Sequence, residues 1–240
     1  MKTILLKFAG PLQSWGSSSH FETRHTDYYP SKSAIIGLIA ASLGYRRDED
    51  DKVKQLNEVD FAVRVDQQGN LLRDYHTAKK YKDNGEFERT YVTNRYYLED
   101  AIFIVAISHQ DDKLMNAIEE GLNNPYFQTF MGRRSCPLSA DFFLGTCSEN
   151  VLDCIKALEW QASKWFMKTE SQSSEITLEI FADSYLINNE NYQLRKDRVE
   201  SFSQKERKFG FRYESRLLVT VSNPFGQKNT QHDIFTYIGD

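Results

Sequence analysis

The sequence predicts an α+β protein built around a sheet, from three features of the chain. An apolar strand-like start leads into a strongly apolar helix-like segment at 31–43. Two further strand-like segments, at 59–65 and 101–107, enclose a polar stretch that resembles a hairpin. A second helix-like segment follows at 111–122. The order strand, helix, strand, hairpin, strand, helix is typical of a ferredoxin-like sheet domain.

The first strand is predicted at Lys2–Phe8, and a long polar loop, 10–30, precedes the first helix. Ser31 is a good helix N-cap and Gly44 a natural stop. The helix between them is apolar on nearly all sides and is therefore expected to be buried. Two interpretations of its N-terminus are open. In the first, the free N–H groups, the hydroxyls and Lys32 hold a phosphate. In the second, Ser31 only caps the helix and Lys32 is solvated. The local pattern favours the second interpretation.

The strands of the first half follow from their apolar patterns. Val59–Val65 alternates apolar with other residues, which predicts a half-buried strand. After a turn at 67–70, the segment Leu71–Thr77 is predicted to return as its hairpin partner. The apolar run Ala101–Ile107 predicts a central strand, and Asp111–Leu122 carries the spacing of an amphipathic helix.

Residues 78–94 lose the apolar periodicity and interleave basic with aromatic side chains around a turn at 83–85. The pattern predicts an excursion from the core, as a hairpin or as a loop that becomes ordered on binding. Such a projection suits a nucleic-acid strand, because its charges attract phosphates and its rings stack on bases. A mobile hairpin with a solvated basic tip explains the composition equally well.

The second half is predicted to contain a helix at 151–165, a strand at 176–186 and two short strands within 208–221. The tail after Asn223 has no strong pattern. Neither an internal repeat nor a low-complexity linker separates the halves, so the second half is expected to pack on the first.

The charge of the chain is unevenly distributed. The net charge is −4 and the pI about 5.8, which argues against a generic nucleic-acid binder. Residues 1–47 nevertheless carry six basic and two acidic side chains, and residues 190–216 carry eight and five. Two interpretations remain open: a focused basic surface on an acidic protein, or ordinary solvated faces.

The three cysteines lack a metal-type spacing, and their odd number indicates reduced thiols and a cytosolic protein. The apolar start is too short for a signal peptide, and no run is long enough to cross a membrane. Phosphate-loop, dinucleotide-binding and zinc signatures do not occur. We therefore expect a soluble cytoplasmic protein that needs no cofactor and no metal.

Two groups of residues could carry chemistry. The opening stretch contains an acid–base set that could cleave RNA without a metal: His20, His25, Tyr28, Tyr29 and Lys32. The same residue types are also common in binding sites. Cys136, beside two arginines, is better interpreted as a packed residue than as a nucleophile.

The segment Gly132-Arg133-Arg134-Ser135 is the second candidate for a binding site. Its glycine permits close approach of the backbone to a ligand, and two adjacent arginines can clamp a phosphate. A surface turn with two solvated arginines is the competing interpretation, and the segment by itself slightly favours it.

A set of motifs spans nearly the whole chain in order and resembles the CasD family. That family is the small RAMP-superfamily subunit of the type I-E CRISPR surveillance complex, Cascade. The motifs are AGPLQSWG at 9–16, PSKS at 30–33, IGLIAA at 36–41, DYHT at 74–77, YLEDA at 97–101, GRRSCP at 132–137, DRV and SF within 197–202, and RY with Arg216 at 212–216.

The resemblance implies an RRM-like ferredoxin fold at 1–145, with a projecting thumb at about 78–94, and a small β-rich part at 146–240. It implies binding of the CRISPR RNA 5′ handle, a place at one end of the backbone filament, contact with the large subunit and only indirect contact with target DNA. No membrane is involved. In type I-E complexes another RAMP subunit cuts the precursor RNA, whereas in type I-C systems the related subunit is the nuclease.

With the resemblance, the phosphate-clamp interpretation of the two arginines and the contact interpretation of the thumb become the stronger ones. The expected handle contacts are Gln13, Trp15, Lys32, His76, Lys79, Lys80, Arg89, Arg133 and Arg134. The leading hypothesis is a non-catalytic RNA-binding subunit. The alternative is a metal-independent endoribonuclease that uses Tyr28 or Tyr29 with His25 and Lys32. A third hypothesis is a scaffold held mainly by protein contacts.

Overall fold

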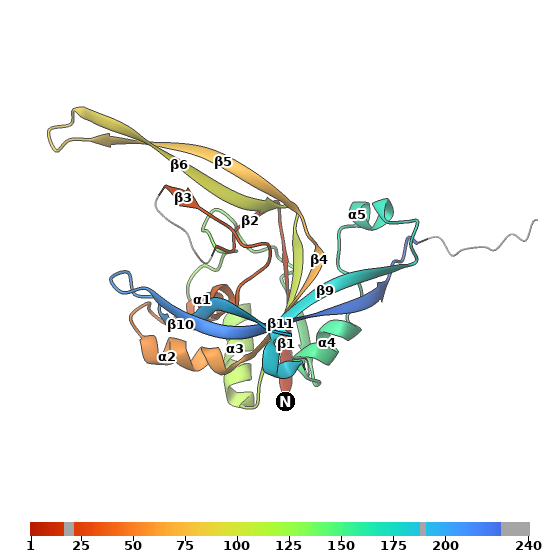
Figure 1. Cartoon of the computed structure of the whole chain (residues 1–240). Coiled ribbons are helices and arrows are strands. Elements are labelled where there is room, and N and C mark those ends of the chain that lie inside the picture. Colours follow the sequence, from red (N-terminus) through yellow and green to blue (C-terminus); the bar gives the residue numbers. More distant parts are fainter. Residues whose placement is uncertain (17–21, 188–190, 227–240) are drawn as a thin grey trace, which may run out of the picture.

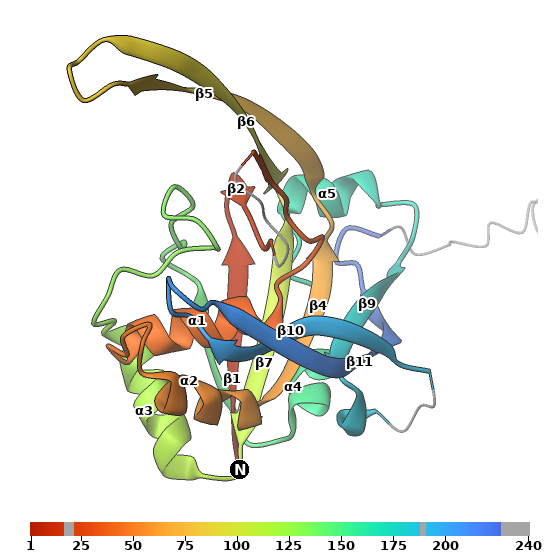
Figure 2. The same cartoon turned by 60° about the vertical axis from the view of Figure 1, so that its left-hand side comes forward.

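The computed structural model describes residues 1–16, 22–187 and 191–226, and a seven-stranded antiparallel sheet forms its centre (Figures 1 and 2). The strand order is β10-β11-β9-β4-β7-β1-β8. The strands are β1 (Lys2–Ala9), β4 (Asp60–Gln67), β7 (Ile102–His109), β8 (Phe143–Cys147), β9 (Glu175–Asp183), β10 (Gln193–Ser201) and β11 (Lys208–Ser222). The mixed α+β class predicted from the sequence is confirmed.

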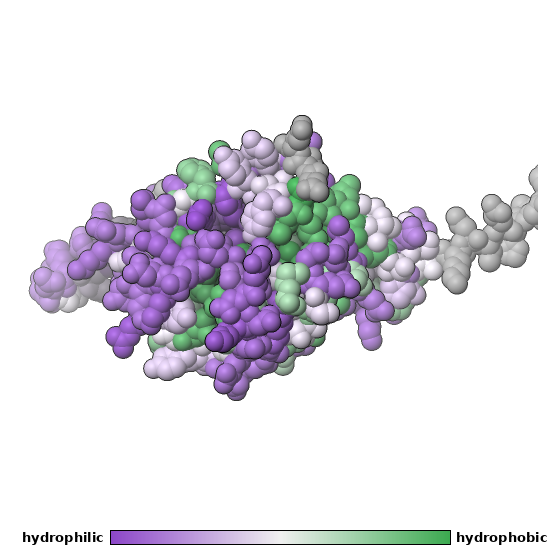
Figure 3. Space-filling model, turned by 90° about the horizontal axis from the view of Figure 1, so that it is seen from below, coloured by the Kyte–Doolittle hydropathy of each residue, from purple (hydrophilic) through white to green (hydrophobic). Residues whose placement is uncertain are grey.

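Helices cover the two faces of this sheet unequally. The first face packs on α1 (Lys32–Ser42), α2 (Asp50–Gln55) and α3 (Asp112–Asn123), with a short 3-10 turn, Leu56–Glu58, after α2. The second face packs on α4 (Val151–Ala157) and α5 (Lys164–Thr169). A 3-10 turn, Ser184–Leu186, follows directly after β9. Seen from below, the surface is largely hydrophilic but retains an apolar area (Figure 3).

The first helix forms where the sequence predicts it. The Ser31 hydroxyl accepts a hydrogen bond from the N–H of Ala34 and caps α1, and Gly44 has a φ of 78° after its last turn. The apolar residues of α1 are buried against the sheet. The second predicted helix is confirmed as α3, whose Asp111 side chain caps the N–H of Lys113.

Strand β4 is buried on both faces, so the prediction of a half-buried strand is wrong. The reason lies in α4 and the turn after it, which cover the second face. Arg64 is fully buried there, pairs with Asp66 at 2.7 Å and donates to the carbonyls of Ile155 and Leu158. A buried charge is tolerated because each of these contacts compensates it.

A long hairpin, β5 (Asn70–Tyr81) and β6 (Phe87–Glu99), projects from the body and is called the thumb from here on (Figure 1). The short strands β2 (Leu12–Gln13) and β3 (Thr23–Arg24) pair with β6 near its base. A hairpin was predicted, but it is longer than 78–94. The predicted pairing of Leu71–Thr77 with Val59–Val65 is wrong, because β5 pairs with β6. At Gly69, with φ of 70°, the backbone passes so close to Glu99 and Ala101 that no side chain would fit.

Three further predictions for the second half need correction. The helix predicted at 151–165 is two short helices, because residues 158–161 leave the helical path to bond Arg64 and Asp66. The two short strands predicted within 208–221 are one strand, β11. Cys147 and Cys154 form a disulfide between the end of β8 and α4, so these two thiols are not reduced, whereas Cys136 is free and buried.

No helix within the described parts of the chain is both long enough and apolar enough to span a membrane.

Candidate nucleic-acid interface

A groove of about 1500 Å³ runs between α1 and the turn that joins β10 to β11, and residues within 14–16, 24–25 and 127–134 form its other walls. Six arginines and two lysines line it: Arg24, Arg46, Arg47, Arg133, Arg134, Arg207, Lys196 and Lys208. Among its described lining residues there is no aspartate or glutamate. A groove lined by one sign of charge concentrates ligands of the opposite sign, so this one suits a polyanion.

The floor of the groove is the side of α1 that carries small residues, which are buried or half-buried. Ser33, Ala34, Gly37 and Ala41 line it, and the ring of Phe202 closes over Gly37. A Cβ at Gly37 would lie 3.4 Å from that ring, so the β10–β11 turn packs closely on the helix at this residue. An apolar floor beneath basic walls offers both flat packing and charge to a ligand.

The basic side chains are densest in an adjoining pocket of about 510 Å³. Six arginines surround it: Arg24, Arg47, Arg95, Arg133, Arg134 and Arg207. Arg24 and Arg95 are register partners on the parallel strands β3 and β6, which brings their side chains to one face. Burial, followed by the nearby charge of Arg47, lowers the pKa of the Arg207 guanidinium, which remains protonated at any ordinary pH.

Arg133 is held in place by two contacts. Its Nη2 donates to the carbonyl of Arg24 at 2.9 Å, and its guanidinium lies 4.4 Å from the centre of the Tyr97 ring. Its Nη1 and the Nε of Arg95 are buried donors that find no acceptor in the described part of the protein. Buried donors of this kind are normally satisfied, so these two are exceptions among the described residues.

Gly132 shapes the turn before the two arginines. Its φ is 78°, and a Cβ there would collide with the backbone carbonyl of Ser14. The adjacent Met131 carbonyl accepts a hydrogen bond from the Ser14 N–H at 3.2 Å. The close approach expected from this glycine is therefore to the protein's own backbone rather than to a ligand.

Two predicted contacts, Gln13 and Trp15, are structural in this fold. The Gln13 amide is fully buried and donates to the carbonyls of Phe8 and Ala101, while its oxygen accepts from the Trp15 indole. Trp15 is 1% exposed and packs edge-on against Phe8. The Gln13 side chain is therefore not available to RNA, and the prediction for it is wrong. Trp15 lines the groove, so its contact with RNA stays a prediction.

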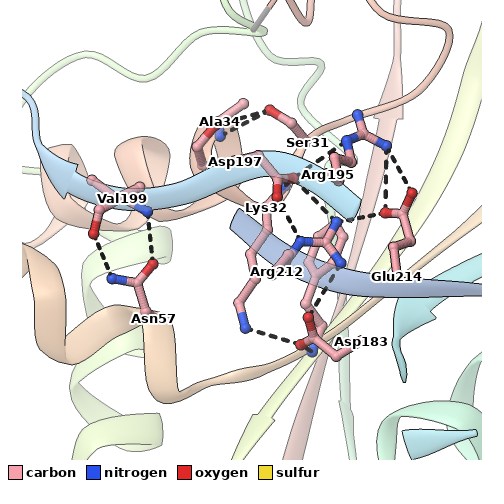
Figure 4. Close-up of polar contacts among 12 residues, drawn as sticks. Ser31, Lys32, Ala34, Asn57, Asp183, Arg195, Asp197, Val199, Arg212 and Glu214 are labelled. Atoms are coloured by element: carbon pink, nitrogen blue, oxygen red, sulfur yellow. Dashed lines mark hydrogen bonds and ion pairs between the residues drawn. The ribbon is translucent and has the colours of Figure 1, made fainter. Parts of the chain in front are cut away.

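Lys32 is likewise buried, contrary to both interpretations of the helix start (Figure 4). Its ammonium pairs with Asp183 at 2.9 Å, and its N–H donates to the Asp197 carboxylate at 2.9 Å. Arg212 binds Asp183 and Asp197 as well. A carboxylate of the protein therefore occupies the anion site that the start of α1 offers, and Lys32 is not available to an RNA phosphate.

The same network uses two arginines that the sequence counted as part of a basic surface. Arg195 lies 3.3 Å from Glu214 and 3.3 Å from Asp27, and Arg212 pairs with Asp197 at 2.7 Å. These cations are neutralised in the interior, so the positive face of this segment is carried by other residues.

The remaining predicted contacts lie in two places. Arg133 and Arg134 line the groove, whereas His76, Lys79, Lys80 and Arg89 lie on the thumb and outside the groove lining. Lys79 is exposed, while Lys80 pairs with Glu88 at 2.8 Å. The Arg89 guanidinium lies 4.3 Å from the Tyr91 ring centre, and His76 contacts the Thr93 hydroxyl at 3.4 Å.

The residues of the nuclease hypothesis do not form one acid–base set. Lys32 is bound as described, and the Tyr29 hydroxyl donates to Glu214 at 2.7 Å. Burial raises the pKa of Tyr29 well above its ordinary range, so it is a poor base. His25 stacks on Tyr96 with 5.5 Å between ring centres, and Tyr28 is exposed. His20 lies outside the described residues.

Sequence reasoning did not select most of the cations that line the groove and the adjoining pocket: Arg24, Arg46, Arg47, Arg95, Arg207, Lys196 and Lys208. The available signal was the excess of basic residues in 1–47 and 190–216. It could not separate these side chains from Lys32, Arg195 and Arg212, because burial depends on which strands meet.

The fold and the groove together define a candidate nucleic-acid-binding protein of the α+β class. The family model described as CRISPR-associated protein (Cas_Cas5) matches residues 3–213. The chain therefore belongs to this CasD/Cas5 family, and the resemblance found in its sequence motifs is confirmed.

Individual relatives agree with this assignment. The chain is 36% identical over 158 residues to the CRISPR system Cascade subunit CasD of Escherichia coli (strain K12), covering 60% of this chain and 70% of that protein. A chain of a structure titled "CRISPR RNA-guided surveillance complex" is 28% identical, with 98% of both chains covered and a TM-score of 0.76. A structure titled "Crystal structure of Cas protein" is 27% identical, with 95% and 98% covered and a TM-score of 0.64.

Proposed function

We propose that this chain is a non-catalytic, RNA-binding subunit of a CRISPR Cascade surveillance complex and that it anchors the 5′ handle of the CRISPR RNA in the groove. The observation that carries the proposal is the groove lining, with eight cationic side chains and no carboxylate among the described residues. The chain as a whole has a net charge of −4, so the concentration of cations is local. The names of the relatives support membership of such a complex.

The groove offers RNA what single strands require. Single-stranded RNA is held by phosphate contacts and by packing of its bases on flat surfaces. The arginine pocket supplies the first, and the small-residue floor on α1 supplies the second. The two buried guanidinium donors on Arg95 and Arg133 would find phosphate or base oxygens as acceptors.

The proposed assembly follows the family. The subunit caps one end of the backbone filament in the cytoplasm, contacts the large subunit, and meets target DNA only through the CRISPR RNA. The exposed thumb, with Lys79, Lys80, Arg89 and His76, is proposed to contact RNA or the neighbouring backbone subunit, because it projects beyond the body (Figure 2).

We also assign a ferredoxin-like, RRM-like unit to about residues 1–145 and a C-terminal β-rich part to 146–240. The order β8-β1-β7-β4, with antiparallel pairing throughout and α1 and α3 on one face, supports the first assignment. Strands β9, β11 and β10 extend the same sheet, which supports close packing of the second part on the first.

The test is binding of the full chain to a synthetic 5′ handle RNA over a range of salt concentrations. Arg134→Ala combined with Arg207→Ala should weaken binding and reduce the slope of log affinity against log salt by about 0.7 for each lost phosphate contact. Lys54→Ala, which removes an exposed charge from α2, is the matched control. An unchanged affinity and slope in the arginine variant would reject the groove as the RNA site and favour the scaffold hypothesis.

A further inference from the structure

A second surface, outside the proposed handle site, combines exposed rings with positive charge. It is the outer face of β10 and β11, where large side chains remain open to solvent: Tyr192 is 60% exposed, Leu194 61%, Phe211 59% and Tyr213 53%. Leu194 lies opposite Tyr213 in the strand register. The alternate residues, Arg195 and Arg212 among them, point inward to the ion-pair network (Figure 4).

Two of the exposed rings on this face contact each other. Tyr192 and Tyr213 meet edge to face with 4.8 Å between ring centres. The ammonium of Lys196 lies 5.9 Å from the centre of the Phe211 ring. Further along the same strands, the carboxylate of Glu200 is paired with Lys208, and Arg198 lies 3.7 Å from Glu58. The charged neighbour of the rings is therefore the cation Lys196, while the carboxylates of Glu200 and Glu58 are paired with other cations.

This face continues the groove. Lys196 lines the groove and also lies over Phe211, and Lys208 and Phe209, at the start of β11, are groove-lining residues as well. A strand that follows the basic wall of the groove past Lys196 would therefore reach the exposed rings. Exposed rings beside cations are the combination that single-stranded nucleic acid uses, since any base can stack on a ring.

We propose that single-stranded RNA leaving the groove continues over the outer face of β10 and β11, stacking bases on Phe211 and Tyr213 with Lys196 at the backbone phosphate between the two surfaces. The inference rests on the proposed function, because it extends the path of the same RNA. A protein partner is the competing outcome of the test, because aromatic rings are enriched at protein interfaces although lysine is depleted there. The surface therefore lengthens the bound segment beyond the groove.

The experiment compares two labelled RNAs on the full chain: the synthetic 5′ handle, and the same handle with a short oligouridine extension at either end. One extended RNA is expected to bind more tightly than the handle alone. Phe211→Ala with Tyr213→Ala should remove that gain, a loss of about fivefold or more, and should leave binding of the short handle unchanged. Leu218→Ala, 58% exposed on the same strand, is the control without a ring.

Two further variants separate stacking from other roles. Phe211→Trp should keep the gain, whereas Phe211→Leu, which preserves apolar area without a ring, should lose most of it. Melting temperatures verify that each variant is folded. If Arg134→Ala with Arg207→Ala weakens handle binding but the ring variants bind extended RNA normally, the inference fails and the proposed function stands.

If neither group of variants alters RNA binding, both the inference and the proposed function fail. If the ring variants bind RNA normally but no longer assemble with the other Cascade subunits, the face is a protein contact and the inference is overturned.

Discussion

The ammonium group of Lys32 lies 2.9 Å from the carboxylate of Asp183, and both side chains are buried. Lys32 begins α1, and Asp183 ends β9, 151 residues later. The backbone N–H of Lys32 also donates to the Asp197 carboxylate on β10. The start of α1 therefore holds the C-terminal strands to the first half of the protein. The segment around Lys32 resembles a phosphate site in the sequence, but its N–H and ammonium groups bind carboxylates of the protein itself.

Replacing Lys32 should lower stability without a specific effect on RNA binding. Lys32→Met keeps the apolar stem but leaves a buried carboxylate with only Arg212 and hydrogen bonds, and removing one partner of a buried pair costs roughly 3 kcal/mol. Urea unfolding of the full chain measures the loss, with Lys54→Met on exposed α2 as the control. A fall in RNA affinity with unchanged stability would restore Lys32 as a contact.

Glu214 makes this network sensitive to acid. Although burial opposes ionisation, Arg195, Arg212 and the Tyr29 hydroxyl hold the pKa of its carboxyl below its usual range. A lowered folded-state pKa stabilises the protein above the unfolded value, which for glutamate is about 4.3. That contribution is lost as the pH falls through the folded value.

The corresponding variant is Glu214→Gln. Its unfolding free energy should be below that of the wild type at neutral pH, and the difference should shrink as the pH falls below about 4.3. Urea unfolding at a series of pH values measures it. A difference that stays constant down to the lowest pH would show that the carboxylate charge is not the source of the stabilisation.

The sequence predicted those features whose signals are local. Ser31 caps α1, Gly44 ends it, and the apolar run from Ile102 to Ile107 lies in β7, because capping, positive φ and apolar runs act within a few residues. The partner of Leu71–Thr77 could not be predicted in the same way. The close passage at Gly69 that directs β5 away from β4 involves Glu99 and Ala101, which are distant in the sequence.

The candidate site shows the same division. Arg133 and Arg134 stand in a recognisable turn and line the groove. Lys32 and Arg207 are both basic residues in polar stretches of the sequence, yet one is buried on Asp183 and the other lines the groove. The difference arises from β9 and β10 meeting the start of α1. The sequence alone does not contain a local signal for that contact.

The disulfide between Cys147 and Cys154 should stabilise the end of β8 and the start of α4. It closes a short loop with a sequence separation of 7, for which chain entropy predicts about 2 kcal/mol. Unfolding of the wild type with and without dithiothreitol measures the effect. The double variant Cys147→Ser/Cys154→Ser should be insensitive to the reductant, and a wild type equally insensitive would show that the bond does not form in solution.

Gly132→Ala should disrupt the turn that presents Arg133 and Arg134. The new methyl group would collide with the Ser14 carbonyl at a φ of 78°, so the turn must move, at a cost of roughly 2 kcal/mol or more. Handle RNA should bind more weakly as a result. Gly85→Ala at the thumb tip is a matched control, because its φ is 84° but its Cβ would meet nothing within 4 Å. An equal loss of RNA affinity in both variants would show that backbone strain alone, and not the collision with Ser14, causes the effect.

Incubation with repeat RNA in EDTA should give no specific cleavage, because the residues that could form a metal-independent nuclease are separated by their contacts. Tyr29 is bound to Glu214, Lys32 is bound to Asp183, and His25 stacks on Tyr96. His25→Ala should therefore alter binding at most, through the groove that it lines. Cleavage at a defined position that disappears in His25→Ala would overturn the non-catalytic assignment. Cleavage that persists in the variant would indicate a contaminating ribonuclease.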